Sequence, residues 1–149
     1  MKILVTGISG RMGQAVKQAI ELNPAAEIAA THDVGQDIAA AMQAADITID
    51  FSFHGFTPEL LATAVAQGKP LVIGTTGHTA EEKAAISEAA KSIPIVFASN
   101  YSVGVNTLFW LTRKATRILK DYDIEIIEMH HHHKLDAPSG TARTLAEVV

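Results

Sequence analysis

Residues 2–13 read KILVTGISGRMG. A short apolar run, Ile3 to Val5, is followed by glycines at the spacing G-x-x-G-x-x-G, namely Gly7, Gly10 and Gly13. Beyond them the apolar residues recur at a helical period, and we expect one helix face to contain Met12, Ala15, Val16, Ala19 and Ile20. A glycine turn between a strand and a helix lets backbone N–H groups reach a pyrophosphate at the positive helix end. The stretch therefore predicts a dinucleotide-binding βαβ unit.

Strand-like and helical patterns alternate as far as residue 98. The expected strands are 2–6, 27–31, 46–51, 71–73 and 95–98, and the expected helices between them begin near residues 10, 37, 58 and 79. Gly68 is a helix stop, and Thr79 with Glu82 forms a capping box. Short apolar strands separated by helices predict a mostly parallel sheet, buried on both faces, in a doubly wound α/β domain.

The character of the sequence changes after residue 98. A polar link at 100–104 precedes an expected helix at 105–120, a strand at 123–129, a polar segment at 130–140 and a final helix at 141–149. We therefore predict two domains, 1–103 for the dinucleotide and 104–149 as the start of a second, substrate-binding domain.

Composition excludes several classes of function. The chain of 149 residues has no cysteine, so disulfides, thiolate catalysis and cysteine zinc sites are ruled out. Its formal charge of −4 argues against binding to nucleic acid. No stretch approaches the ~20 apolar residues of a membrane span. We expect a cytoplasmic, soluble protein with neither a nucleic-acid nor a membrane partner.

Three further segments lie at the expected carboxyl ends of strands. Asp33 stands 20 residues after Gly13, where an acidic side chain bonds the ribose hydroxyls of a dinucleotide, although a turn or capping role is the alternative. An aspartate there repels a 2′-phosphate, which mildly favours NADH over NADPH. Residues 50–52 follow the third strand. The run Gly74 to Gly77 follows the fourth, and it suits a nicotinamide ribose or carboxamide.

The segment 130–142, HHHHKLDAPSGTA, is the most informative. A purification tag and a metal site are the first alternatives, but the run is internal, and adjacent histidines on an extended chain point to opposite sides. His130 and Lys134 can both donate protons near neutral pH. Ser139, Gly140 and Thr141 open a helix whose free N–H groups suit a carboxylate. The segment predicts an acid–base site for a small polyanionic acid, with no metal.

Taken together, residues 5–13, 74–77, 98–104 and 128–142 resemble the 4-hydroxy-tetrahydrodipicolinate reductase (dihydrodipicolinate reductase) family of bacterial lysine and diaminopimelate biosynthesis. The resemblance covers essentially the whole chain, and the histidine-lysine segment is its most specific part. It implies a Rossmann-like doubly wound parallel sheet followed by the first part of an α+β substrate domain. It also implies an oxidoreductase that uses NADH or NADPH to reduce a small dicarboxylate substrate to tetrahydrodipicolinate.

The resemblance also implies roles for individual residues. His130 would donate and accept a proton, and Lys134 would be the second proton donor. The substrate carboxylates would be bound by His131, Gly140 and Thr141. The cofactor would be lined by Gly7, Ile8, Ser9, Gly10, Arg11, Met12, Asp33, Gly74, Thr75, Thr76, Ala98, Ser99, Asn100 and Tyr101.

The sequence departs from the family in three ways. Ser99 stands where Pro is frequent, and Tyr101 stands where Phe is frequent. Family members continue well beyond the position of Val149, through a segment that completes the substrate domain and builds a homo-tetramer. We therefore expect a truncated form that has little turnover and that lacks much of the contact surface of the family's tetramer.

Three alternatives remain open at this point. A nicotinamide-binding module without turnover would tolerate changes at His130 and Lys134. A metal-dependent hydrolase would lose function with a chelator. A different dehydrogenase of the same fold, acting on aspartate or a sugar, agrees with the glycine turn but not with the histidine-lysine segment.

Overall fold

A computed structural model describes residues 1–33, 35–133 and 137–149. It divides the chain into two compact units, Met1–Ala98 and Ser99–Val149. The domain boundary that we expect after residue 103 stays a prediction.

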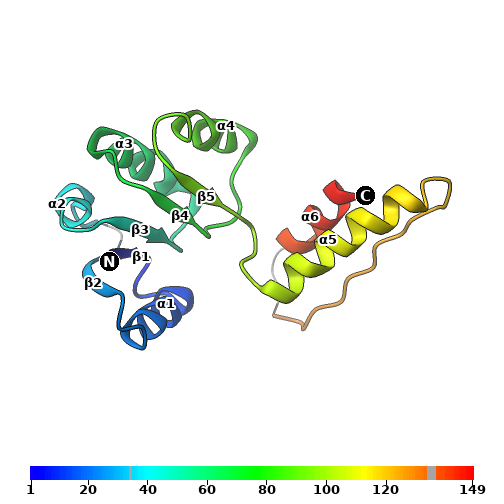
Figure 1. Ribbon diagram of the computed structural model, residues 1–149, viewed down its shortest axis with the longest axis horizontal. Helices are drawn as coiled ribbons and strands as arrows, with labels where there is room; N and C mark the ends of the chain where they lie inside the picture. The colour runs from blue at the N-terminus through cyan, green and yellow to red at the C-terminus, as the bar shows by residue number, and fades with distance from the viewer. Residues whose placement is uncertain (34, 134–136) are drawn as a thin grey trace. The chain divides into compact units, whose positions relative to one another are not determined.

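The first unit is built on one sheet of five parallel strands in the order β2-β1-β3-β4-β5 (Figure 1). The strands are β1 (Lys2–Thr6), β2 (Glu27–His32), β3 (Ile47–Asp50), β4 (Leu71–Ile73) and β5 (Ile95–Phe97). Because β2 and β3 flank β1 on opposite sides, the loops after β1 and β3 diverge and leave a crevice at their carboxyl ends. The predicted doubly wound α/β fold is confirmed.

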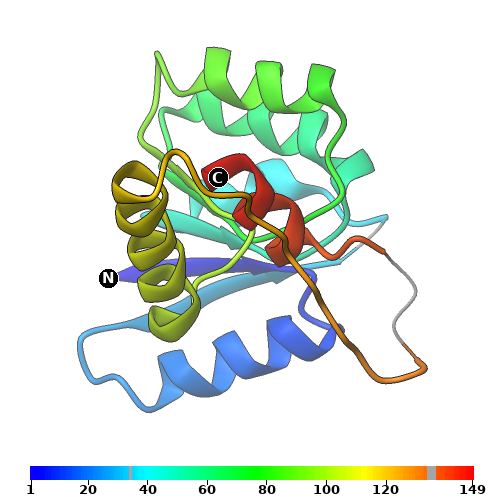
Figure 2. The same ribbon diagram turned by 90° about the vertical axis from the view of Figure 1, so that its right-hand side faces the viewer.

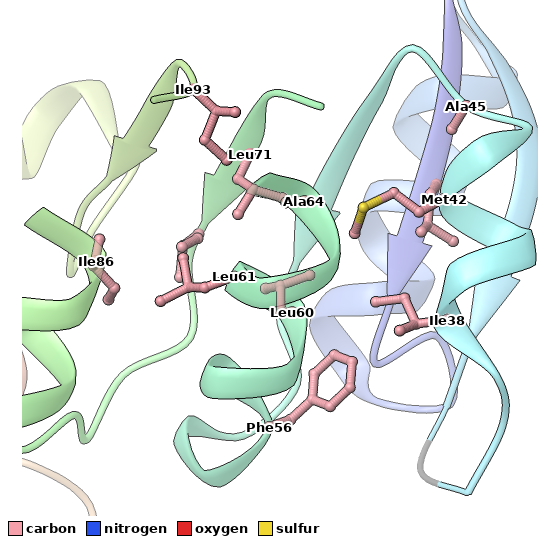
Figure 3. Close-up of a cluster of buried hydrophobic side chains, with 12 residues drawn as sticks. Ile38, Met42, Ala45, Phe56, Leu60, Leu61, Ala64, Leu71, Ile86 and Ile93 are labelled. Carbon is pink, nitrogen blue, oxygen red and sulfur yellow. The ribbon is translucent and has the colours of Figure 1, made fainter. Parts of the chain in front are cut away.

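Helices cover both faces of this sheet, with α1 on one side and α2, α3 and α4 on the other (Figure 2). They are α1 (Arg11–Glu21), α2 (Ile38–Gln43), α3 (Thr57–Gln67) and α4 (Ala80–Ala89), with the short 3₁₀ turn η1 (His54–Phe56) before α3. The larger core lies on the side of α2, α3 and α4. It joins Met42 and Leu60 to Leu71 and Ile86, and Figure 3 shows these residues and their neighbours.

Helix ends follow the local sequence signals. Gly68 ends α3 in the left-handed conformation with φ 63°, which a glycine adopts without strain. Thr79 and Glu82 form both bonds of the predicted capping box at α4. Asp37 caps α2 through a hydrogen bond from the N–H of Ala39.

The apolar face expected for α1 is only partly buried. Met12, Ala15 and Ala19 are exposed, whereas Gly13 and Ile20 are buried and Val16 is partly buried. A Cβ on Gly13 would lie 2.2 Å from the carbonyl oxygen of Gly7, so the helix approaches the loop backbone through this glycine. This close approach determines which side of α1 faces the sheet. The spacing of the apolar residues does not reveal that contact.

The second unit contains α5 (Val103–Ile118) and α6 (Gly140–Val148), which contact each other. Ser102 and Ser139 cap them, each accepting a hydrogen bond from the N–H three residues further on. The strand predicted at 123–129 is wrong, because none of these residues belongs to a strand. The apolar residues of this segment favour a strand, but the backbone N–H and C=O groups of a strand must also form hydrogen bonds with a neighbouring strand. Within the described part of this unit there is none.

Candidate functional site: a glycine-lined cavity and a histidine at a helix start

The turn after β1 leaves no room for a side chain at Gly7, in the turn itself, or at Gly13, in α1. Gly7 has φ 70°, and a Cβ there would lie 2.4 Å from the carbonyl oxygen of Phe51. Gly13 meets the turn from the other side, as described above. The N–H of Gly7 bonds the carbonyl of His32 at 2.9 Å, which fixes the turn against the end of β2. Backbone rather than side chain therefore forms the surface that the turn presents to a ligand.

Helix α1 begins directly on this turn and has no acidic residue in its own first turn. Gly10 is the N-cap residue, and it provides no side-chain cap. Ser9, Arg11 and Met12 are exposed around it, and Ile8 is half-buried. A helix start of this kind favours an anion, because its first N–H groups lack partners within the helix.

A cavity of about 640 Å³ opens beside the turn. Four of the residues predicted to bind the cofactor line it: Gly7, Ser9, Gly10 and Asp33. Sequence reasoning did not assign its other lining residues, which are His32, Gly35, Gln36, Asp37, Phe51, Ser52, Phe53, Gly55, Phe56 and Glu59. What they share is their position in the chain: His32 ends β2, and the others lie in the segments that follow β2 and β3.

Asp33 faces the glycine turn. Its carboxylate accepts hydrogen bonds from the backbone N–H of Ser9 at 3.1 Å and from the Ser9 hydroxyl at 3.1 Å. Next to it, the His32 ring stacks on Phe56 with centroids 4.9 Å apart and donates from Nε2 to the carbonyl of Gln36. The carboxylate is thus placed at one end of the cavity, within reach of the residues that begin α1.

The segment Gly74–Thr76 follows β4 but does not line this cavity. A Cβ on Gly74 would lie 2.2 Å from a ring carbon of Phe51, and the Gly74 N–H bonds the carbonyl of Asp50 at 2.8 Å. Thr75 is buried, and Thr76 is exposed. Residues 74–76 are therefore held against the end of β3.

A second polar cluster, which the sequence analysis missed, lies where η1 meets the start of α4. His54 donates from Nδ1 to the carboxylate of Glu82 at 2.9 Å, and this bond lowers the pKa of Glu82. His78 shares a hydrogen bond with the Thr57 hydroxyl, and burial lowers the pKa of His78. Both shifts favour a neutral His78 beside an ionised Glu82.

In the second unit, Glu128 stands between His130 and the start of α6. One carboxylate oxygen lies 3.5 Å from Nδ1 of His130. The same side chain accepts hydrogen bonds from the N–H and the hydroxyl of Ser139, the N-cap of α6. His130 is thereby brought next to the helix start that contains Gly140 and Thr141.

The remaining predicted residues are placed as follows. Lys134 lies outside the described residues. His131 is exposed, and its Nδ1 accepts from the N–H of His133.

The predicted cofactor residues at 98–101 include two that contact α6. Asn100 donates to the Thr141 hydroxyl at 3.4 Å, and Ser99 shares a hydrogen bond with Thr144. Tyr101 is exposed. Ala98 closes the first unit.

No group of three or more histidine or acidic side chains in residues 1–33, 35–133 and 137–149 converges on a common point as metal ligands do. Among the helices in the same ranges, none is both long enough and apolar enough to cross a bilayer.

Comparison with known proteins agrees with these features. The family model described as "Dihydrodipicolinate reductase, N-terminus" matches residues 1–101, and the model for the C-terminus matches residues 104–149. A 4-hydroxy-tetrahydrodipicolinate reductase of Akkermansia muciniphila is 65% identical over 150 residues, covering 100% of this chain and 61% of the relative. The protein of the same name from Campylobacter jejuni subsp. jejuni is 44% identical over 149 residues, again covering 100% of this chain and 62% of the relative.

A solved structure gives the same result for the fold. Dipicolinate-bound dihydrodipicolinate reductase from Paenisporosarcina sp. TG-14 superposes with a TM-score of 0.82 at 25% sequence identity, covering 99% of this chain and 64% of that chain. The chain thus spans less than two thirds of the length of these relatives. On the match of both family models along its length, the chain belongs to the dihydrodipicolinate reductase family.

Proposed function

We propose that this chain binds NADH or NADPH, and that the whole protein uses it to reduce 4-hydroxy-tetrahydrodipicolinate to tetrahydrodipicolinate in lysine and diaminopimelate biosynthesis. The observation that carries the proposal is the backbone cradle at Gly7 and Gly13. Neither position has room for a Cβ, and a cavity of about 640 Å³ adjoins them. Such a cradle suits a diphosphate that must approach the backbone closely.

At the adenosine end, we assign the pyrophosphate to residues 7–12 and the adenosine ribose to Asp33. The carboxylate of Asp33 already accepts hydrogen bonds from Ser9, and ribose hydroxyls are donors of the same kind. A 2′-phosphate would bring a second negative charge to the same place, which costs free energy. We therefore propose that NADH binds more tightly than NADPH.

At the other end, we assign the nicotinamide half to residues 74–76 and 98–101. When bound, the cofactor supplies a hydride to an unsaturated carbon of the substrate ring. The residues of this chain would hold the nicotinamide half in position. Gly74 is bonded through its N–H to the end of β3, and buried Thr75 fixes the same segment.

Proton delivery is assigned to His130, with Lys134 as the second donor. Glu128 lies at Nδ1 of His130, so Nε2 is the atom that we assign to the substrate. Glu128 contacts both this histidine and Ser139 at the start of α6. The N–H groups of Gly140 and Thr141, which lack partners within the helix, suit a substrate carboxylate. His131 would bind the same acid.

We also propose a homo-oligomer for the whole protein. The second unit exposes large apolar side chains, Trp110 and Ile127 among them, which an assembly would cover. Light scattering of the whole protein tests this, and a monomer at micromolar concentration would contradict it.

The test of the main proposal is a fluorescence titration of this chain with NADH and NADPH, with and without pyridine-2,6-dicarboxylate. Saturable binding of NADH supports the cofactor assignment, and its absence would overturn it. Tighter NADH binding with the dicarboxylate supports the substrate assignment.

Turnover is measured on the whole protein by oxidation of NADH with the pathway intermediate. His130→Gln and Lys134→Ala should each abolish turnover while leaving the affinity for NADH unchanged. Binding of NADH without any turnover by the unsubstituted whole protein would indicate a binding module instead.

A further inference from the structure

Asp50, the last residue of β3, is 1% exposed, and its carboxylate accepts three side-chain hydrogen bonds. Oδ1 accepts from the hydroxyls of Thr6 and Ser52, both at 2.5 Å. Oδ2 accepts from the hydroxyl of Thr75 at 2.6 Å. A buried carboxylate is thereby satisfied entirely by neutral donors, and the ion pairs of the described residues do not include Asp50.

The three hydroxyls come from three different segments. Thr6 is the last residue of β1 and directly precedes the glycine turn. Ser52 belongs to the turn after β3, and Thr75 belongs to the segment after β4. These segments also touch through their backbones, since Gly7 packs on the carbonyl of Phe51. One carboxylate therefore sets the spacing of three loops at the same edge of the sheet.

Stability alone does not account for an ionisable group at this position. Burying a carboxylate is costly, and a buried charge is weak grounds for inferring stabilisation. Thr48, on the same face of β3 and fully buried, has a hydroxyl without a hydrogen-bond partner among the described residues. The buried hydroxyl of Thr48 thus connects no segments, whereas the carboxylate of Asp50 connects three segments by hydrogen bonds.

We propose that Asp50 is a positioning residue for the nicotinamide cofactor. Through Thr6 it holds the turn assigned to the pyrophosphate, and through Thr75 it holds the segment assigned to the nicotinamide half. Its carboxylate touches no ligand and acts only through these hydroxyls. The inference rests on the proposed function, because the two segments matter together only when one dinucleotide spans both.

The test compares NADH with ADP-ribose, which has the pyrophosphate but no nicotinamide. Thr75→Val keeps the shape of the side chain and removes the hydrogen bond. It should raise the Kd for NADH about 10-fold and leave the Kd for ADP-ribose within about 2-fold. Thr6→Val should raise both constants, because it releases the pyrophosphate turn. Asp50→Asn should also raise both, and the Kd for NADH should rise more.

Controls separate positioning from a general loss of structure. Thr75→Ser restores the hydroxyl and should recover NADH binding. Thr48→Val is the matched control, since it makes the same change on β3 where no bond is lost, and it should leave both constants unchanged. Thermal unfolding of each variant shows that it is folded during the titration. If Asp50→Asn does not fold, the two threonine variants carry the test.

The outcomes distinguish the two proposals. If the unsubstituted chain binds neither NADH nor ADP-ribose, the proposed function fails and the inference fails with it. If it binds both ligands, and Thr75→Val weakens both equally or neither, the positioning role of Asp50 is overturned while the cofactor assignment stands.

Discussion

The carboxylate of Glu128 binds Ser139 twice, accepting from its backbone N–H at 2.8 Å and from its hydroxyl at 2.6 Å. Ser139 in turn caps α6 by accepting from the N–H of Ala142. Since His130 lies 3.5 Å from the same carboxylate, Glu128 connects the proposed proton donor to the helix start proposed for the substrate carboxylate.

Glu128→Ala should loosen the start of α6. Loss of the two charge-assisted bonds to Ser139 should cost about 1–3 kcal/mol of local stability. The amides of Ala142 and Arg143 should then exchange with solvent faster, as measured by NMR hydrogen exchange. Glu125→Ala, an exposed glutamate of the same segment, is the control and should leave this exchange unchanged. Unchanged exchange in Glu128→Ala would contradict the role given to Glu128.

Gly13→Ala should both destabilise the first unit and abolish binding of NADH. The added Cβ would meet the backbone of Gly7 and Ile8 at 2.2 and 2.7 Å, so α1 must move away from the turn. We expect a loss of about 1–3 kcal/mol in the free energy of unfolding by denaturant. Gly104→Ala is the control, because its nearest neighbour lies 3.8 Å away and alanine favours a helix. Normal NADH binding by Gly13→Ala would contradict the proposal that the backbone at Gly7 and Gly13 binds the diphosphate.

Asp33→Asn should weaken the preference for NADH over NADPH. The asparagine keeps a hydrogen-bond acceptor but removes the negative charge that a 2′-phosphate would meet. The ratio of the Kd for NADPH to that for NADH should fall roughly 10-fold, or about 1.4 kcal/mol. Asp37→Asn is the matched control, since Asp37 lines the same cavity and asparagine caps a helix equally well. A ratio that does not fall in Asp33→Asn would show that its charge does not select the cofactor.

The first unit should lose stability as the pH falls below the ordinary histidine pKa. Burial lowers the pKa of His78, so the unfolded chain binds a proton there before the folded chain does. Glu82 opposes this shift, while His54 and Lys83 add to it and Asp50 opposes it. The stability due to neutral His78 is therefore full above the unfolded pKa of 6.5 and falls with pH below it.

The measurement is the thermal midpoint at pH 8 and pH 5.5, before Glu82 is protonated. His78→Gln should show a smaller drop between the two values than the unsubstituted chain. His133→Gln, an exposed histidine of the second unit, should show the same drop as the unsubstituted chain. Equal drops in all three proteins would contradict the role of His78.

Much of the first unit is set by signals that act over a few residues. The bounds of β1 and β4, the stop at Gly68 and the capping box at Thr79 follow from local backbone preference and from apolar period. The parallel direction of the strands follows from the alternation of strands and helices. The glycine turn was predicted for the same reason, since its spacing and its place between strand and helix are both local.

The tertiary structure alone decided the rest. Contacts between distant segments place Gly13 of α1 against the glycine turn and gather three hydroxyls around Asp50. Among the described residues, 123–129 has no partner strand. Local pattern shows which side chains are apolar or polar, and which residues turn the chain. It does not report which segments become neighbours, because that depends on the summed packing of the whole sheet.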